Sequence, residues 1–179
     1  MLDIFSTMIH IISATTAHIP VIQDIAYRTW PETFADILSS EQIDYMLDMM
    51  YSDAALNRQL QELGHAFLLA KSNKTDSFLG YISYESPYQG MAQTKIHKIY
   101  ISPDAQGLGV GKALMEAVEN GARARGDHWM MLNVNKYNKA EAFYQKLGFE
   151  VVGTEDIDIG SGFLMEDKVM RKRIMPDKA

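Results

Sequence analysis

Cysteine is absent from the 179-residue sequence. Its absence excludes disulfide-stabilised secreted scaffolds, thiolate metal sites and cysteine nucleophiles. The five histidines are scattered, and no two have the HxH or HxxxH spacing that brings two ligands to one face of an element. We therefore expect no metal site.

Basic residues are in the minority, with 17 Lys and Arg against 23 Asp and Glu and a net charge of -6. A protein that binds a nucleic-acid backbone usually presents a broad basic surface, so we expect no nucleic-acid partner. An acidic protein suits a cationic partner better, although this net charge is also ordinary for a soluble domain.

Long apolar runs are missing as well, and no stretch approaches the ~20 residues that a membrane helix needs. Residues 1–12 contain an acidic residue, no early basic residue and no small-residue cleavage site, so we expect no signal peptide. These absences predict a soluble, cytoplasmic protein without a membrane partner.

The chain shows no internal repeat, low-complexity stretch or linker, and its apolar content of 47% is typical of a globular protein. A chain of this length usually forms one core. We expect a single domain over residues 1–179, in which residues 1–8 form a loose N-terminal extension.

Helical patterns dominate the first third of the chain, and β-type patterns become frequent after it. Pro31 is expected to end the first helix, and Ser39 and Gln42 have the spacing of a capping box at the start of the second. The predicted helices run from Ala17 to Trp30, from Ser39 to Met50, over Asp53–Leu63, from the glycine-rich segment to Gly126, and over Asn138–Leu147. The predicted strands are Ile9–Ile12, Ala66–Lys71, Phe78–Glu85, Thr94–Ser102, His128–Val134, Phe149–Ile157 and Phe163–Ile174.

The glycine-rich segment Gln106–Gly111 leads directly into a predicted helix. Glycines let successive backbone N–H groups converge on an anion, and a helix start adds partial positive charge, so the segment predicts a phosphate site. Gly107 and Gly111 are too close together for a GxxxxGK[ST] motif, and GLGVG is not the GxGxxG of dinucleotide-binding folds. A helix-entry loop that binds nothing is the alternative.

A second motif, NKAEAFYQKLGF at residues 138–149, follows the glycine-rich loop, a helix and an apolar strand. This pair of motifs resembles the GNAT-type acyl-CoA N-acyltransferases over Lys95–Glu150, and the order of elements extends the resemblance to nearly the whole chain. The segment Trp30-Pro31-Glu32-Thr33 is similar, more loosely, to the bacterial polyamine N-acetyltransferase branch. The resemblance implies an α/β (α+β) fold. It has a mixed, mainly antiparallel sheet of six to seven strands, with splayed central strands and flanking helices.

The resemblance also implies acetyl-CoA as the cosubstrate. The loop amides would cradle its pyrophosphate, and one open strand would pair with the pantetheine amides. The positions that the resemblance assigns to coenzyme A are Ile99, Tyr100, Ile101, Gln106, Gly107, Leu108, Gly109, Val110, Gly111, Lys112, Asn133, Asn138 and Tyr144. Asn138 stands six residues before Tyr144, whereas the family asparagine usually stands seven before the tyrosine, so a plain N-cap role is its alternative.

Tyr144 matches the family tyrosine that protonates the leaving thiolate, and His97 lies near the position where the family often places a general base. A core tyrosine and a structural histidine are the alternatives. We expect Tyr27, Trp30 and Glu32 to meet His97 at the acceptor site.

Without cysteine, the simplest reaction is direct attack of a primary amine on the acetyl thioester in a ternary complex. The net charge and six acidic residues around the expected acceptor site predict a small cationic, polyamine-like acceptor. These residues are Glu32, Glu41, Asp44, Asp48, Asp156 and Asp158. The alternatives are an amino-acid or peptide amine and a non-catalytic acyl-CoA-binding or regulatory module. The sequence does not decide whether the protein forms a homodimer.

Overall fold

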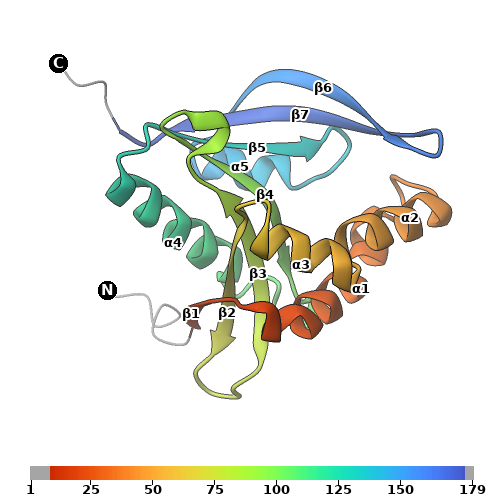
Figure 1. Cartoon of the computed structure of the whole chain (residues 1–179), viewed down its shortest axis with the longest axis horizontal. Helices are drawn as coiled ribbons and strands as arrows, with labels where there is room; N and C mark the ends of the chain where they lie inside the picture. Colours follow the sequence, from red (N-terminus) through yellow and green to blue (C-terminus); the bar gives the residue numbers. More distant parts are fainter. Residues whose placement is uncertain (1–8, 176–179) are drawn as a thin grey trace.

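The computed structural model describes residues 9–175, so the expected N-terminal extension lies outside the described residues. Seven strands form one sheet in the order β1-β2-β3-β4-β5-β7-β6, and only the pair β4 and β5 is parallel (Figure 1). The strands are β1 Ile9–Ser13, β2 Ala66–Ser72, β3 Phe78–Glu85, β4 Gln93–Ile101, β5 Trp129–Asn135, β6 Glu150–Gly160 and β7 Phe163–Arg173. The α-helices are α1 Ile19–Phe34, α2 Ser40–Tyr51, α3 Asp53–Gln61, α4 Val110–Arg125 and α5 Glu141–Lys146. The predicted fold class is confirmed.

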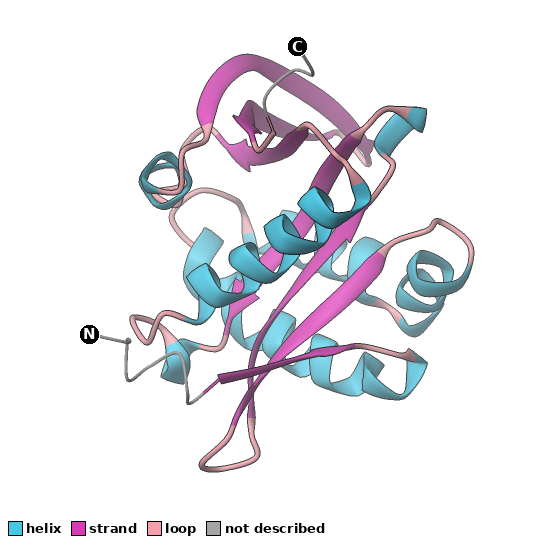
Figure 2. Cartoon of the chain, turned by 90° about the vertical axis from the view of Figure 1, so that its left-hand side faces the viewer, coloured by secondary structure: helices cyan, strands magenta, loops and turns pink. Residues whose placement is uncertain are grey.

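The sheet separates two hydrophobic cores. Adjacent strand residues point to opposite faces, so Leu69 packs with α1, α2 and α3, whereas Ala70 packs with α4. Figures 1 and 2 show α4 running across the sheet. Helices α1, α2 and α3 lie together in a separate group. Within residues 9–175, no helix combines the length and apolar composition that crossing a bilayer requires.

Helix α1 continues through Pro31, so the prediction that this proline ends the helix is wrong. Proline removes one backbone donor and leaves the carbonyl of Tyr27 without its helical partner. Tyr27 and Pro31 are both exposed, so water can bond that carbonyl. On the other side of the helix, Trp30 and Phe34 are buried with ring centroids 4.6 Å apart, and this burial offsets the lost bond.

Local sequence signals predict the other helix ends to within a few residues of their positions in the structure. Ser39 Oγ accepts a hydrogen bond from the Gln42 amide at 3.1 Å, as predicted for the start of α2. The Gln42 side chain does not complete a capping box, because it donates to the Leu164 carbonyl at 2.9 Å. Helix α5 begins only at Glu141, because residues 138–140 form a turn in which Asn138 Oδ1 accepts from the Ala140 amide at 2.9 Å.

The central strands β4 and β5 separate along their length. They pair only over Gln93–Ile96 and Trp129–Leu132, whereas β4 continues to Ile101 and β5 to Asn135. The register between β3 and β4 shifts at His97, because Ser83 pairs with Lys98 and Tyr84 with Ile96. This bulge bends the strand beside the point where the two central strands part. The predicted splaying is confirmed.

Gly80 in β3 allows this bent strand to lie close to its neighbour. A Cβ atom at Gly80 would lie 2.8 Å from the Tyr100 carbonyl oxygen and 2.9 Å from Ile101 Cδ1. Backbone cannot move away without breaking the ladder, so we expect Gly80→Ala to lower the free energy of unfolding by about 1–3 kcal/mol. Urea denaturation measures this, with Gly153→Ala as the matched control because nothing lies within 4 Å of that Cβ. Equal stability of the two variants would contradict the prediction.

Candidate active site

A cavity of about 560 Å³ opens where β4 and β5 diverge. Its walls come from α1 and α2 on one side and from β6 and β7 on the other, with α5 at one end. Two hydrogen bonds join these walls: Gln42 Nε2 donates to the Leu164 carbonyl, and Tyr45 Oη donates to the Ile159 carbonyl at 2.7 Å. The cavity is therefore bounded by segments far apart in the sequence.

The glycine-rich loop lies at the start of α4. Gly107 and Gly109 adopt φ angles of +78° and +79°, a conformation that favours glycine. No side chain within residues 9–175 caps the helix, so the first amides of α4, which lack helical partners, are free to bind an anion. Gln106 at the loop entry also lines the cavity, and exposed Lys112 lies in the first turn. The loop thus presents unpaired backbone amides at a helix start, an arrangement that suits an anion.

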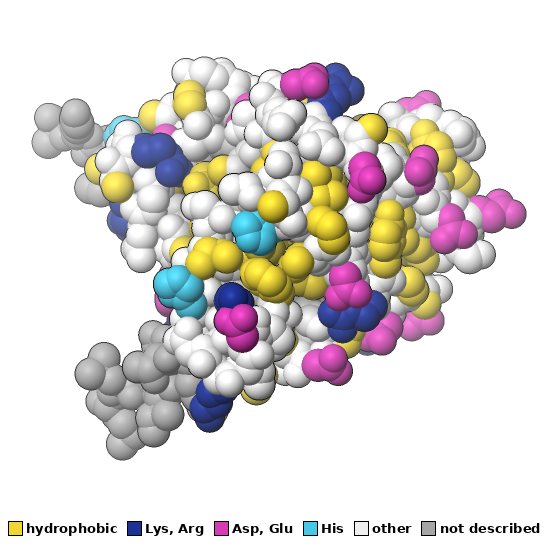
Figure 3. Space-filling model, turned by 60° about the horizontal axis from the view of Figure 1, so that its bottom comes forward, with side chains coloured by type: hydrophobic (Ala, Val, Ile, Leu, Met, Phe, Trp, Pro, Cys, Tyr) yellow, Lys and Arg dark blue, Asp and Glu magenta, His cyan; other side chains and the backbone are white. Residues whose placement is uncertain are grey.

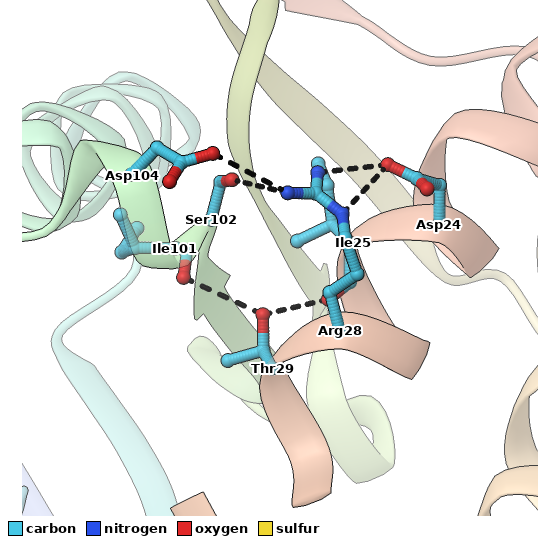
Figure 4. A network of polar contacts seen from close by, with 7 residues as sticks. All are labelled: Asp24, Ile25, Arg28, Thr29, Ile101, Ser102 and Asp104. Atoms are coloured by element: carbon cyan, nitrogen blue, oxygen red, sulfur yellow. Dashed lines mark hydrogen bonds and ion pairs between the residues drawn. The ribbon is translucent and has the colours of Figure 1, made fainter. Parts of the chain in front are cut away.

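The end of β4 is fixed to α1 by a polar network (Figure 4). Arg28 Nη1 donates to Ser102 Oγ at 3.2 Å and lies 3.7 Å from Asp104. The same guanidinium pairs with Asp24 at 2.8 Å, and Thr29 Oγ1 donates to the Ile25 carbonyl and, more weakly, toward that of Ile101. These contacts position the strand end from which the loop leaves.

Among the described strands, only β3 pairs with the segment Ile99–Ile101, because the pairing of β4 with β5 ends at Ile96. All three residues line the cavity. An extended, amide-containing ligand could pair with this open strand edge in the manner of an added strand. The splayed gap and the free loop amides together fit coenzyme A, whose pantetheine arm carries amides and whose pyrophosphate is an anion.

Tyr144 reaches the cavity from α5 and is 8% exposed. None of the described residues hydrogen-bonds to its hydroxyl, and burial raises its pKa well above the ordinary value of 10.0. Phe143 and Phe149 pack against the ring, with centroids 5.3 and 6.2 Å away. Phe143 also packs on Gly111, where an added Cβ would lie 3.2 Å from it. The tyrosine is therefore a fixed, protonated group beside the loop.

His97 lines the same cavity at the bulge of β4. Burial, together with the charges of Lys98 and Lys95, lowers its pKa from 6.5 to about 4. Its Nε2 lies 3.1 Å from Glu85 Oε2, and its ring stacks on that of His65. The imidazole is therefore neutral at physiological pH.

A polar cluster crosses the four C-terminal strands of the sheet. Lys95 Nζ donates to Asn133 Oδ1, and Asn133 Nδ2 donates to Glu155 Oε2 at 3.0 Å and toward Asp167 Oδ2 at 3.4 Å. All four side chains line the cavity. Burial lowers the pKa of Lys95 and raises that of Asp167. We call Lys95, Asn133, Glu155 and Asp167 the floor cluster.

Sequence reasoning identified Asn133 but missed the other three members of the floor cluster, together with Glu85 and His65. A polar residue within the apolar strand His128–Val134 was a usable signal for Asn133. The sequence offered no comparable signal for the others, because they approach only through strand pairing.

The structure brings Trp30 and His97 to the cavity but not Tyr27 or Glu32. Trp30 packs against Tyr100, with ring centroids 5.6 Å apart. Glu32 is exposed, because two residues along a helix turn the side chain to the far side, and Tyr27 is 45% exposed. The expected grouping of four residues is therefore only half present.

The acidic residues expected around the acceptor also lie outside the cavity. Glu41, Asp44 and Asp48 are on the exposed side of α2, and Asp156 and Asp158 are exposed on β6. Figure 3 shows acidic side chains gathered on the side of the molecule that holds α1 and α2 in Figure 1. The carboxylates that line the cavity are those of Glu155, which is itself exposed, and of buried Asp167.

The splayed sheet, the free loop amides and the buried tyrosine define an acyl-CoA N-acyltransferase type of site. A family profile described as "Acetyltransferase (GNAT) domain" matches residues 34–169, which is more than half of the chain. The chain belongs to the GNAT acetyltransferase family.

Several relatives have named activities. Spermidine N(1)-acetyltransferase of Thermoplasma acidophilum is 29% identical over 153 residues, covering 81% of this chain and 88% of that protein. L-methionine sulfoximine/L-methionine sulfone acetyltransferase of Pseudomonas paraeruginosa is 35% identical over 89 residues, covering 48% of this chain and 52% of that protein. The match to this second relative thus spans only about half of its length.

A crystal structure of the PaiA N-acetyltransferase of Thermoplasma acidophilum in complex with coenzyme A is similar throughout. Its TM-score is 0.75 at 25% identity, and the alignment covers 92% of this chain and 98% of that chain.

Proposed function

We propose that this protein transfers an acetyl group from acetyl-CoA to a primary amine of a small cationic, polyamine-like acceptor. The acceptor attacks directly while both substrates are bound. One observation carries the proposal: a single cavity joins the open edge of β4, Gln106 at the entry of the glycine-rich loop, Tyr144, His97 and the floor cluster. The spermidine acetyltransferase among the relatives supports the choice of acceptor.

Bound acetyl-CoA supplies the activated acyl group as a thioester. The amides of Gly107–Lys112 hold the pyrophosphate, and the open edge of Ile99–Ile101 aligns the arm that leads to the thioester. Tyr144 donates a proton to the thiolate as it leaves, since burial keeps its hydroxyl protonated. His97 accepts a proton from the acceptor nitrogen, since burial keeps its imidazole neutral.

The floor cluster provides the charge that selects a cationic acceptor. Glu155 and Asp167 offer carboxylates in the cavity, and Lys95 is paired with Asn133. A distal ammonium beside these carboxylates gains charge-assisted hydrogen bonds while the reacting nitrogen remains free to lose its proton.

Incubation with acetyl-CoA and a panel of amines tests the proposal through release of free CoA. We expect turnover with spermidine, and kcat/KM for spermidine should fall more steeply with salt than that for a neutral-tailed amine of similar length. Calorimetric titration with CoA checks the cosubstrate separately. Failure to bind CoA would refute the whole proposal, whereas equal salt dependence would refute only the cationic acceptor.

Asp167→Asn tests the floor cluster directly. Loss of its charge removes a charge-assisted hydrogen bond to the substrate ammonium, worth about 1.5–3 kcal/mol. We therefore expect KM for spermidine to rise about tenfold or more with little change in kcat. Steady-state kinetics measures this. Asp48→Asn, which removes the same charge from the exposed side of α2, should leave KM within about twofold. A similar KM in both variants would contradict this role of Asp167.

A zwitterionic acceptor such as an amino acid is the second candidate. Lys95 and Lys98 also line the cavity, so a substrate carboxylate has cationic partners there. The methionine sulfoximine acetyltransferase among the relatives acts on an amino-acid derivative, as its name states. Inclusion of amino acids in the amine panel separates the two candidates, because preference for an acceptor with a carboxylate contradicts the polyamine proposal.

A further inference from the structure

Two titratable side chains lie behind His97, on the side that does not line the cavity. Glu85 Oε2 is 3.1 Å from His97 Nε2 and 4.0 Å from His65 Nε2. The rings of His65 and His97 are stacked, with centroids 4.1 Å apart and planes inclined by 10°. His97 lines the cavity, whereas Glu85 and His65 do not. The order from the cavity outward is therefore imidazole first and carboxylate second.

Three separate segments bring these side chains together. Glu85 ends β3, His65 immediately precedes β2, and His97 is the extra residue at the bulge of β4. The stacked His65 ring restricts the plane of the His97 ring on one face, and the Tyr88 ring lies edge-on with its centroid 6.1 Å away. The contact with Glu85 then fixes which nitrogen of His97 faces away from the cavity.

We propose that Glu85 is the positioning residue that holds His97 as the Nε2–H tautomer, so that its free Nδ1 accepts the proton of the acceptor ammonium. This inference rests on the proposed function. One N–H bond of the ammonium breaks and an Nδ1–H bond forms, which leaves a neutral amine and an imidazolium. The Nε2 proton then passes to Glu85, whose side chain is 28% exposed, and from there to water.

The environment of His97 agrees with this assignment. None of the described residues hydrogen-bonds to Nδ1, so that nitrogen is available to a substrate. Burial keeps both stacked histidines neutral, since the pKa of each is lowered to about 4. The imidazolium formed in the reaction is paired at once with the Glu85 carboxylate, which offsets its desolvation. The titratable groups that face His97 are Glu85, His65, Tyr88, Lys95 and Lys98.

The same three side chains also bring three ligand-type atoms within 4.8 Å of one another. The two imidazole planes are nearly parallel, however, and the lone pair of each ring nitrogen lies in its own ring plane. These lone pairs therefore lie in two nearly parallel, separated planes and do not converge on one ion. The geometry favours an oriented histidine over a metal centre.

The test is the tautomer of His97, observed by two-bond proton–nitrogen NMR of the full chain carrying ¹⁵N-labelled histidine at pH 7. We expect the wild type to show Nε2 protonated and Nδ1 unprotonated. In Glu85→Gln the amide can donate to Nε2 as well as accept from it, so the Nδ1–H tautomer should become populated. Finding wild-type His97 as the Nδ1–H tautomer would overturn the inference.

Kinetics on the same variants provides the second measurement. With an amine that the wild type acetylates, Glu85→Gln should lower kcat at least about tenfold while KM and CoA affinity stay within about twofold. Glu62→Gln, an exposed carboxylate at the end of α3, is the matched control and should change neither kcat nor the tautomer. An unchanged kcat in Glu85→Gln would overturn the inference. If no amine is acetylated, the proposed function fails, but the tautomer still decides the role of Glu85 because its measurement needs no turnover.

Discussion

Replacement of Tyr144 by phenylalanine is expected to lower kcat by roughly 10²- to 10³-fold while leaving the affinity for CoA unchanged. The hydroxyl reaches the cavity without a hydrogen-bond partner among the described residues, and burial keeps it protonated. Removing it takes away the proton donor for the leaving thiolate but leaves the packed ring in place. Steady-state kinetics and calorimetric titration with CoA measure the two quantities separately.

Tyr137→Phe is the matched control, because Tyr137 is 61% exposed and does not line the cavity. It should retain wild-type kcat. An unchanged kcat in Tyr144→Phe would instead identify Tyr144 as a core residue. Binding of CoA without turnover of any amine would favour a non-catalytic acyl-CoA-binding module, which the fold alone does not exclude.

Acidification is expected to destabilise the protein steeply between pH 6.5 and pH 4. Burial lowers the pKa of His65 and His97 from 6.5 to about 4 in the folded state, whereas the unfolded chain binds these protons near pH 6.5. The unfolded state therefore binds more protons in this range, and stability falls as the pH falls. A shift of this size corresponds to roughly 3 kcal/mol for each histidine. Above pH 6.5 this contribution is constant.

The variant His65→Phe isolates one of these contributions, because it retains a ring that can stack on His97 but cannot be protonated. When the pH is lowered from 7 to 4, the free energy of unfolding should fall in both proteins, but it should fall less in the variant. The two decreases should differ by roughly 3 kcal/mol. Urea denaturation at a series of pH values measures the difference. Parallel pH profiles of the two proteins would contradict the assigned cause.

Features that depend on local backbone preference could be predicted from the sequence. Glycines at positions 107 and 109 adopt the positive φ angles that let the loop turn into α4. The C-terminal end of α5 is a second example of local backbone preference. Gly148 has φ +90°, and the Phe149 amide donates to the Tyr144 carbonyl at 3.1 Å. The spacing of the two motifs then indicated the GNAT fold and the position of Tyr144.

The arrangement of charge around the cavity was decided only by the tertiary structure. Asn133 meets Glu155, Asp167 and Lys95 across 22, 34 and 38 positions of sequence, through strands that pair in an order different from their order in the chain. Local propensity contains no information about such pairing. For this reason the acidic residues inferred from sequence proximity lie outside the cavity.

The orientation of His97 depends on the same kind of long-range contact. Alternation along β4 predicts side-chain faces only while the register is regular, and the bulge at this residue shifts the register by one position. Its partners then come from the end of β3 and from the segment before β2. The sequence by itself thus determined the family, the loop and the tyrosine, because these depend on local conformation and motif spacing. Only the folded sheet determined which charged groups line the cavity, because that depends on strand order and register.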